Sequence, residues 1–338
     1  MSGKWSFFGF LLFSCPTMPT RRTRLPQEIS ICVIDCLVDD QDRKTLAVCS
    51  LVCQTWFSIT RPHLFKDVVV SSNKTVSFSK ILASPARQSM VATSAHIRTV
   101  NFPGLPRLLH IYPPTGEDLL YANAVGEILT AIPQLTALRL GSIHWPNIAL
   151  RKATLSQMNL DSVVMMDLSM LVQVISNLEA LESLRLNVHF ARTFPGPISS
   201  SPPSLQRLKT LDCDHISDHQ FFPWLTSLAP LPPITSLSLG DQLFPHTPGA
   251  LQLIMATSET LRCFKASRIL SPQVCLPNLF HSHKDLRSVT LLVKRDCSPP
   301  ELFLNRETTY EARSVDERGK SYTVVNFKLG GDKGTEDV

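Results

Sequence analysis

Apolar residues recur through the middle of the chain in the order apolar-x-x-apolar-x-apolar. Eight copies lie between residues 97 and 291, and from the second copy onward their starts are 21 to 27 residues apart. Each copy has apolar residues at alternate positions, which predicts a short strand with one buried face. The copies begin at Ile97, Leu135, Leu160, Leu181, Leu208, Ile234, Leu261 and Leu286.

Segments with apolar residues at helical spacing separate several of these strands. They cover residues 119–132, 168–175 and 250–255. A strand followed by a helix, repeated, stacks into a curved array with a parallel sheet inside and helices outside, because no single unit can bury its own apolar face. We therefore expect an α/β solenoid over residues 96–298.

Residues 25–66 predict a separate group of three short helices, so the chain as a whole is expected to be α+β. Pro26 and Glu28 suit a first helical turn, since that turn tolerates a missing N–H and its positive end favours an acid. Residues 39–42 form a polar break, and a second helix is expected over 43–52. A third helix contains Trp56 and is expected to end at Pro62. The first helix has apolar residues at helical spacing: Ile29, Val33, Ile34 and Leu37.

This segment resembles an F-box. The resemblance rests on Leu25-Pro26-x-Glu28-Ile29, on two spaced apolar helices and on Val52-Cys53-x-x-Trp56, which occur in the family's order. Arg61-Pro62-His63-Leu64-Phe65 is similar to the segment that closes the motif. The downstream copies resemble the leucine-rich repeats of F-box proteins, although the asparagine expected after each strand is mostly absent.

The resemblance implies a recognition protein and not an enzyme. An F-box packs against the Skp-type adaptor of cullin–RING ubiquitin ligases, and the repeats present a surface to a protein target. The implied partners are the adaptor, through it a cullin, and a target of unknown identity. The alternative is a repeat-based binding scaffold that acts without the ligase. The residues implied in adaptor binding are Leu25, Pro26, Ile29, Ile34, Leu51, Val52 and Trp56.

Composition narrows the class of protein further. Hydrophobic residues make up 43% of the chain and charged residues 18%, which favours a packed core over a disordered chain. The formal net charge is +5, and the tight basic cluster is limited to Arg21, Arg22 and Arg24, so we expect no nucleic-acid partner. Nine cysteines in a chain of this size are read as reduced thiols, which favours the cytoplasm or nucleus.

The segments outside the two predicted domains have a less regular pattern of apolar and polar residues. An apolar run over residues 5–13 is too short to span a bilayer, and no membrane partner is expected. Residues 1–24 are either a weak targeting segment on a flexible N-terminus or a mispredicted start before Met18, and the second is favoured. Residues 67–95 are expected to be a connector with short helices. Residues 299–338 are expected to be a partly disordered tail with one strand over 320–328.

Two groups of residues suggest metal ligands, and both are better explained by structure. The pairs Cys32/Cys36 and Cys49/Cys53 are one helical turn apart, whereas zinc-binding pairs usually lie closer together on a turn. Residues 212–219 are rich in Asp and His, and His215 and His219 have the spacing of one helix face. Within them Cys213 fits an inward strand position and the acids fit a helix-capping loop.

The sequence contains no Gly-x-Ser-x-Gly elbow and no glycine-rich phosphate-binding loop before Lys-Ser or Lys-Thr. We therefore expect no catalytic residue, no metal and no cofactor. The polar positions between the apolar strand residues are instead candidates for contact with a target. Three of the six are basic, which favours an acidic or phosphorylated target. These positions are Arg139, Arg185, Asp212, Ser238, Lys265 and Thr290.

Overall fold

The chain divides into two compact units, residues 1–60 and residues 61–338. The predictions for residues 1–24 and for Leu25 fall outside the part of the chain that is described. The computed structural model describes residues 26–83, 94–104, 114–145, 150, 154–191, 205–216, 220–240, 248–269, 280, 282–294, 308–317 and 320–329.

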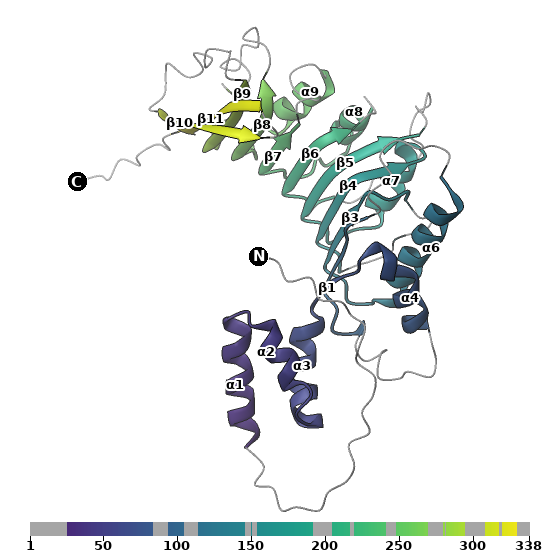
Figure 1. Ribbon diagram of the computed structural model, residues 1–338. Helices are drawn as coiled ribbons and strands as arrows, with labels where there is room; N and C mark the ends of the chain where they lie inside the picture. The colour runs from purple at the N-terminus through teal and green to yellow at the C-terminus, as the bar shows by residue number, and fades with distance from the viewer. Residues whose placement is uncertain are drawn as a thin grey trace, which may run out of the picture. The chain divides into compact units, whose positions relative to one another are not determined.

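The first unit is built from the three expected helices, α1 (Gln27–Asp39), α2 (Arg43–Cys49) and the start of α3 (Gln54–Phe65) (Figure 1). The polar break before α2 is confirmed, and Asp42 caps α2 by accepting hydrogen bonds from the backbone N–H of Thr45 at 3.1 Å and its hydroxyl at 2.5 Å. Helix α2 ends at Cys49, earlier than predicted, because the chain then turns tightly toward α3.

Helix α3 continues through Pro62 to Phe65, so the prediction that Pro62 ends the helix was wrong. A proline in a last turn removes one N–H donor, and its fixed φ is compatible with a helix. Phe65 packs against the apolar core of the second unit. This packing favours the helical geometry of the last turn despite the missing hydrogen bond.

The second unit contains one sheet in which nine strands run parallel in the order of the chain (Figure 1). The eight predicted strands are all present, and a ninth precedes them. The strands are β1 (Asp67–Val69), β2 (Thr99–Phe102), β3 (Ala137–Gly141), β4 (Gln157–Met165), β5 (Ser183–Phe190), β6 (Thr210–Ile216), β7 (Ser236–Leu239), β8 (Cys263–Ile269) and β9 (Ser288–Lys294).

Helices lie along one face of this sheet, as Figure 1 shows. Parallel strands that neighbour one another in chain order are joined by right-handed crossovers, which carry every connection to the same side. Helices α6, α7 and α9 match the three predicted helical segments, and α8 was not predicted. The helices are α4 (Ser72–Ala83), α6 (Gly116–Ala131), α7 (Leu168–Ser176), α8 (Phe221–Thr226) and α9 (Pro248–Ala256).

The segment 67–95 differs from the predicted connector. Strand β1 pairs in parallel with β2, with Val68 opposite Val100. Helix α4 buries Phe78 in the main core, and the hydroxyl of its Ser79 donates a hydrogen bond to the carboxylate of Glu127 on α6. The described part of this segment therefore belongs to the sheet unit.

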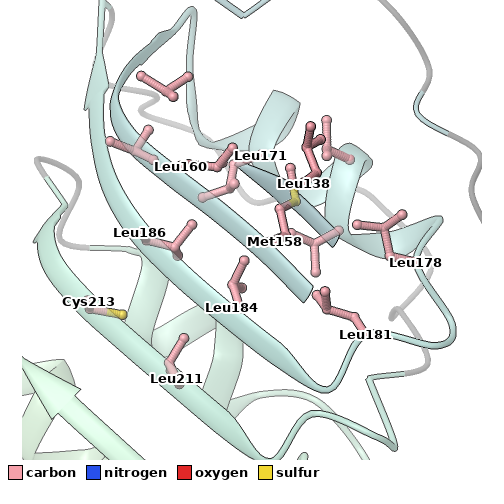
Figure 2. Close-up of a cluster of buried hydrophobic side chains, with 14 of the residues drawn as sticks. Leu138, Met158, Leu160, Leu171, Leu178, Leu181, Leu184, Leu186, Leu211 and Cys213 are labelled. Atoms are coloured by element: carbon pink, nitrogen blue, oxygen red, sulfur yellow. The ribbon is translucent and has the colours of Figure 1, made fainter. Parts of the chain in front are cut away.

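The core lies between the sheet and the helices. Figure 2 shows apolar side chains of β3 to β6, among them Leu160, Leu186 and Cys213, gathered on the side of the sheet where α7 contributes Leu171. All four side chains are fully buried. Alternate strand residues point into this core, so the residues between them point to the opposite face.

A repeated hydrogen-bond pattern marks the start of each parallel strand from β2 to β9. The carbonyl of Arg98 accepts the N–H groups of Thr136 at 2.8 Å and Ala137 at 3.0 Å. One carbonyl accepts two successive N–H groups of the next strand in the same way at each following step. The other residues whose carbonyls do this are Lys66, Thr136, Ser156, Glu182, Lys209, Thr235 and Arg262.

The strand register corrects the start of one predicted copy of the apolar pattern, and a further copy precedes those predicted. Gln157 pairs with Ser183, so the third copy begins at the buried Leu155 and not at Leu160. From this copy to the last, the starts are 25 to 27 residues apart. Phe65-x-x-Val68-x-Val70 is a further copy, which the sequence contains and which gives strand β1.

Two antiparallel strands, β10 (Thr308–Glu317) and β11 (Lys320–Leu329), extend the sheet beyond β9, with β11 paired to β9. The predicted strand over 320–328 is confirmed. Strand β10 lies in the segment predicted to be a partly disordered tail, and it forms by backbone pairing although its sequence is largely polar. Among the helices of the described residues, none has the length and apolarity needed to cross a membrane.

Candidate protein-docking surfaces

Large apolar side chains are exposed on the first unit. Of the twelve exposed large hydrophobic side chains among the described residues, seven lie between positions 29 and 57. Apolar side chains gathered in this way on so small a unit are typical of a surface that a partner covers. The seven are Ile29, Ile31, Val33, Val48, Leu51, Val52 and Phe57.

One part of this surface is a face of helix α1. Residues one helical turn apart along α1 line a shallow, open groove of about 420 Å³. Their spacing places them in one stripe, because residues three and four apart are neighbours on a helix. The lining is almost entirely apolar or thiol-bearing, with one carboxylate at its N-terminal end. It consists of Glu28, Ile29, Cys32, Val33, Cys36 and Leu37.

The other part is the turn between α2 and α3. Leu51 is 66% exposed, and Val48 and Val52 are each 64% exposed. The turn is held by backbone hydrogen bonds from Leu51 to Val48 at 3.0 Å and from Val52 to Cys49 at 3.1 Å, and the Ser50 hydroxyl donates to the carbonyl of Ala47 at 2.6 Å. These apolar side chains are therefore presented by a fixed backbone.

A polar link inside the first unit supports the exposed surface. The indole Nε1 of Trp56 donates to Oγ of the buried Ser30 at 3.1 Å, and that hydroxyl donates to the carbonyl of Pro26 at 3.3 Å. The hydroxyl of the buried Thr60 donates to the carbonyl of Trp56 at 2.8 Å. Trp56 thus ties α3 to the start of α1.

The residues predicted to bind an adaptor divide into two groups. Pro26, Ile29, Leu51 and Val52 are exposed and available for contact. Ile34 is fully buried and Trp56 is half-buried, so both support the fold of the unit. Val48 on α2 and the thiols of the α1 groove were not among the predicted contact residues, although apolar residues at helical spacing in both helices were a signal for them.

The cysteines of this unit are free thiols, with Cys32, Cys36 and Cys53 exposed and Cys49 buried. No cluster of three or more His, Cys, Asp or Glu side chains with the arrangement of a metal site occurs among the described residues.

The Asp- and His-rich segment 212–219 begins in strand β6, so His215 does not share a helix face with His219, which lies outside the described residues. The ring of His215 instead lies 4.5 Å from that of His189 on the neighbouring strand. Cys213 is fully buried, and burial together with the nearby Asp212 carboxylate raises the pKa of its thiol well above the ordinary value. This thiol is therefore a packing group.

The polar strand positions form one row across the sheet. We call the sheet face opposite helices α4 to α9 the open face, and none of the described helices of the sheet unit lies on it (Figure 1). The six predicted target-contact positions occupy this row, and Asn101 and Asn159 complete it. Along the strands from β2 to β9 the paired residues are Asn101, Arg139, Asn159, Arg185, Asp212, Ser238, Lys265 and Thr290.

Charge in this row is mixed. Nε of Arg185 lies 3.4 Å from Oδ2 of its neighbour Asp212, and both side chains are accessible to solvent. Arg139 and Lys265 are exposed and make no ion pair with the other described residues. This row therefore offers two cations without an acidic partner among the described residues and a third whose pairing is partial.

Comparison with known proteins finds one family match, in the N-terminal part of the chain. Residues 23–71 match the family model described as F-box-like, a segment that contains all three helices α1 to α3. The match supports an F-box protein, a class whose domains bind Skp-type adaptors and whose members are typically adaptor subunits and not enzymes. No curated protein sequence matches the chain.

Proposed function

We propose that this chain docks on the Skp-type adaptor of a cullin–RING ubiquitin ligase and presents a protein target to the ligase. The observation that carries the proposal is the exposed apolar surface of the F-box-like segment, above all Leu51 and Val52 on the turn after α2. Complete burial of one such side chain contributes about 1.5–3 kcal/mol. A few of them supply the apolar centre of a specific protein interface.

The size of the first unit supports the same conclusion. Few of its described residues are buried, with Ile34 and Leu46 the largest of them, and a unit of this length covers little of its own apolar surface. A partner that covers the α1 groove and the turn at Leu51 lowers the free energy of both surfaces.

We further propose that the sheet unit is an irregular leucine-rich-repeat solenoid that binds the target on its open face. The spacing of 25 to 27 residues between most copies, strands in chain order and helices on one side support this assignment. The row from Asn101 to Thr290 is polar and has one residue from each of the strands β2 to β9, which suits recognition of another protein.

Co-purification of the full chain with a recombinant Skp-type adaptor tests the docking proposal. We expect the adaptor to bind the wild-type chain and to be lost with Leu51→Asp, which puts a charge into the proposed interface. The matched control is Leu120→Asp, since Leu120 is 64% exposed on α6 in the other unit. Circular dichroism checks that both variants fold.

The outcome also separates the ligase subunit from a scaffold. The ligase role is supported if the chain captures the adaptor together with a cullin, and if Leu51→Asp abolishes this capture while Leu120→Asp leaves it intact. Absence of adaptor binding by the folded wild-type chain, or equal binding by both variants, contradicts it. A chain that binds a target and leaves its lifetime unchanged acts as a scaffold.

A further inference from the structure

We propose that the open face binds an acidic segment of a partner protein and holds a carboxylate or phosphate group between Arg139 and Arg185. This inference rests on the proposed role of the open face in target binding. It adds the chemical class of the segment and the residues that recognise it.

The register places the two arginines on either side of one position. Arg139 on β3 pairs with Asn159 on β4, which pairs with Arg185 on β5. Neighbouring strands are about 4.8 Å apart, so the two arginine Cα atoms are separated by about 10 Å. An anion above Asn159 is within reach of both guanidinium groups, and arginine forms bidentate hydrogen bonds with carboxylate and phosphate.

Both guanidinium groups retain donors for a ligand. Arg139 is exposed and has no ion pair with another described residue. Arg185 contacts Asp212 through Nε at 3.4 Å, a long and solvent-exposed ion pair that contributes little stability. Because exposed pairs of this kind are weak, an incoming anion can replace part of that contact at small cost.

A second row, two residues earlier on the strands, supplies hydroxyl groups. These side chains are half-buried and form no side-chain hydrogen bond with the other described residues. They are small enough to let an extended chain approach the sheet, and they can donate to its carbonyl or anionic oxygens. The hydroxyl-bearing residues of this row are Thr99, Ser183, Thr210, Ser236 and Ser288. Ala137, Gln157 and Cys263 hold the same row position on β3, β4 and β8.

The same face disfavours a nucleic acid. Asp212 stands beside Arg185 in the row, and Asp161 lies two residues after Asn159 on β4, so a continuous phosphate backbone meets like charges. The row from Asn101 to Thr290 has no aromatic side chain on which a base stacks. A peptide with isolated acidic groups can instead place them at Arg139 and Arg185 and keep them away from Asp161 and Asp212.

Fluorescence anisotropy with labelled peptides tests the inference on the full chain. The probes are a Glu-rich peptide, the same peptide with phosphoserine in place of Glu, a Gln-rich peptide and oligothymidylate. We expect both acidic peptides to bind more tightly than the Gln peptide, with an affinity that falls as salt rises. Tighter binding of the phosphoserine peptide identifies phosphate as the preferred group, and equal or weaker binding identifies carboxylate.

The double variant Arg139→Gln/Arg185→Gln removes both cations and keeps side-chain length. We expect it to weaken binding of the acidic peptides by about tenfold or more, as loss of charge-assisted hydrogen bonds predicts. The control is Lys80→Gln, an exposed cation on helix α4, which we expect to leave binding unchanged.

Unchanged binding by the double variant, equal affinity for the Gln peptide, or preference for oligothymidylate overturns the inference. Adaptor co-purification is measured on the same variants, and we expect Arg139→Gln/Arg185→Gln to retain it. If the wild-type chain binds the adaptor but not the acidic peptides, only the inference of an acidic segment is refuted. If the wild-type chain does not bind the adaptor, the docking proposal is refuted instead.

Discussion

Trp56 and Ser30 join the third helix of the first unit to the first, through a hydrogen bond of 3.1 Å from the indole Nε1 to the serine Oγ. Ser30 is buried, and its hydroxyl also donates to the carbonyl of Pro26 at the start of α1. The pair thus holds α1 at the end where its exposed apolar face begins.

Removal of either partner is expected to loosen α1. We predict that Ser30→Ala and Trp56→Phe each lower the free energy of unfolding of the first unit by about 1–2 kcal/mol, because a partly buried polar group loses its partner. Hydrogen exchange of α1 amides measures the effect. The double variant should lose less than the sum of the single losses, and strict additivity would show that the bond contributes nothing.

Thiol labelling of the folded chain should follow exposure. We predict that Cys32 and Cys36 react readily with a maleimide, whereas Cys213 stays unmodified, since burial raises the pKa of its thiol and blocks access. Bound adaptor should protect the two thiols of the α1 groove and leave the exposed Cys263 of the sheet unit reactive. Peptide mass spectrometry assigns the sites, and equal labelling of Cys32 with and without bound adaptor would remove α1 from the interface.

Stability should decrease as the solution becomes acidic, with a contribution from His283. This side chain is fully buried and its Nε2 lies 2.9 Å from the carbonyl oxygen of Ile254. Burial lowers the pKa of His283 below its ordinary value of 6.5, although the contact with Ile254 acts in the opposite direction. The unfolded chain therefore binds the proton more readily, so the contribution is present above pH 6.5 and is lost as pH falls below it.

The measurement is the melting temperature at pH 7.5 and pH 5.5. We expect the wild-type chain to melt lower at pH 5.5, and His283→Gln, which keeps a hydrogen-bond donor and does not titrate, to reduce that difference. An unchanged difference in the variant would assign the pH dependence to other groups.

Two glycines should respond oppositely to alanine. A Cβ on Gly240 would lie 1.8 Å from the carbonyl oxygen of Asp214, so Gly240→Ala forces β7 away from β6 and should destabilise the sheet unit. A Cβ on Gly116, at the start of α6, meets nothing within 4 Å. Gly116→Ala should be neutral or stabilise by about 0.4–1 kcal/mol. Chemical denaturation compares the two, and equal stability of both variants would contradict the close approach of β6 and β7.

Much of the sheet was predictable because its pattern is local. Alternation of apolar residues located eight strands, and the polar positions between them identified a row that the backbone pairing brings into register. The copy Phe65-x-x-Val68-x-Val70 carries the same signal, although it lies before the range 96–298 predicted for the repeat array. The start at Leu155 was misplaced by five residues, because apolar residues at 160, 163 and 165 are also buried and imitate the pattern.

Other features depend on contacts that no local pattern contains. Ile29 and Ile34 are both apolar residues of α1, and only the packing of α2 and α3 decides that Ile34 is buried and Ile29 exposed. Strand β10 is polar and forms because β11 offers its backbone groups. Pro62 has the residue type of a helix end, and the packing of Phe65 outweighs that preference.

The most direct test of the central claim is a hydrogen–deuterium exchange map of the full chain with and without the Skp-type adaptor. We predict slower exchange in α1, in α2 and in the turn that carries Leu51 and Val52, with exchange in β3 to β9 unchanged. Protection confined to the sheet unit, or no protection at an adaptor concentration that saturates a known F-box protein, would contradict the account.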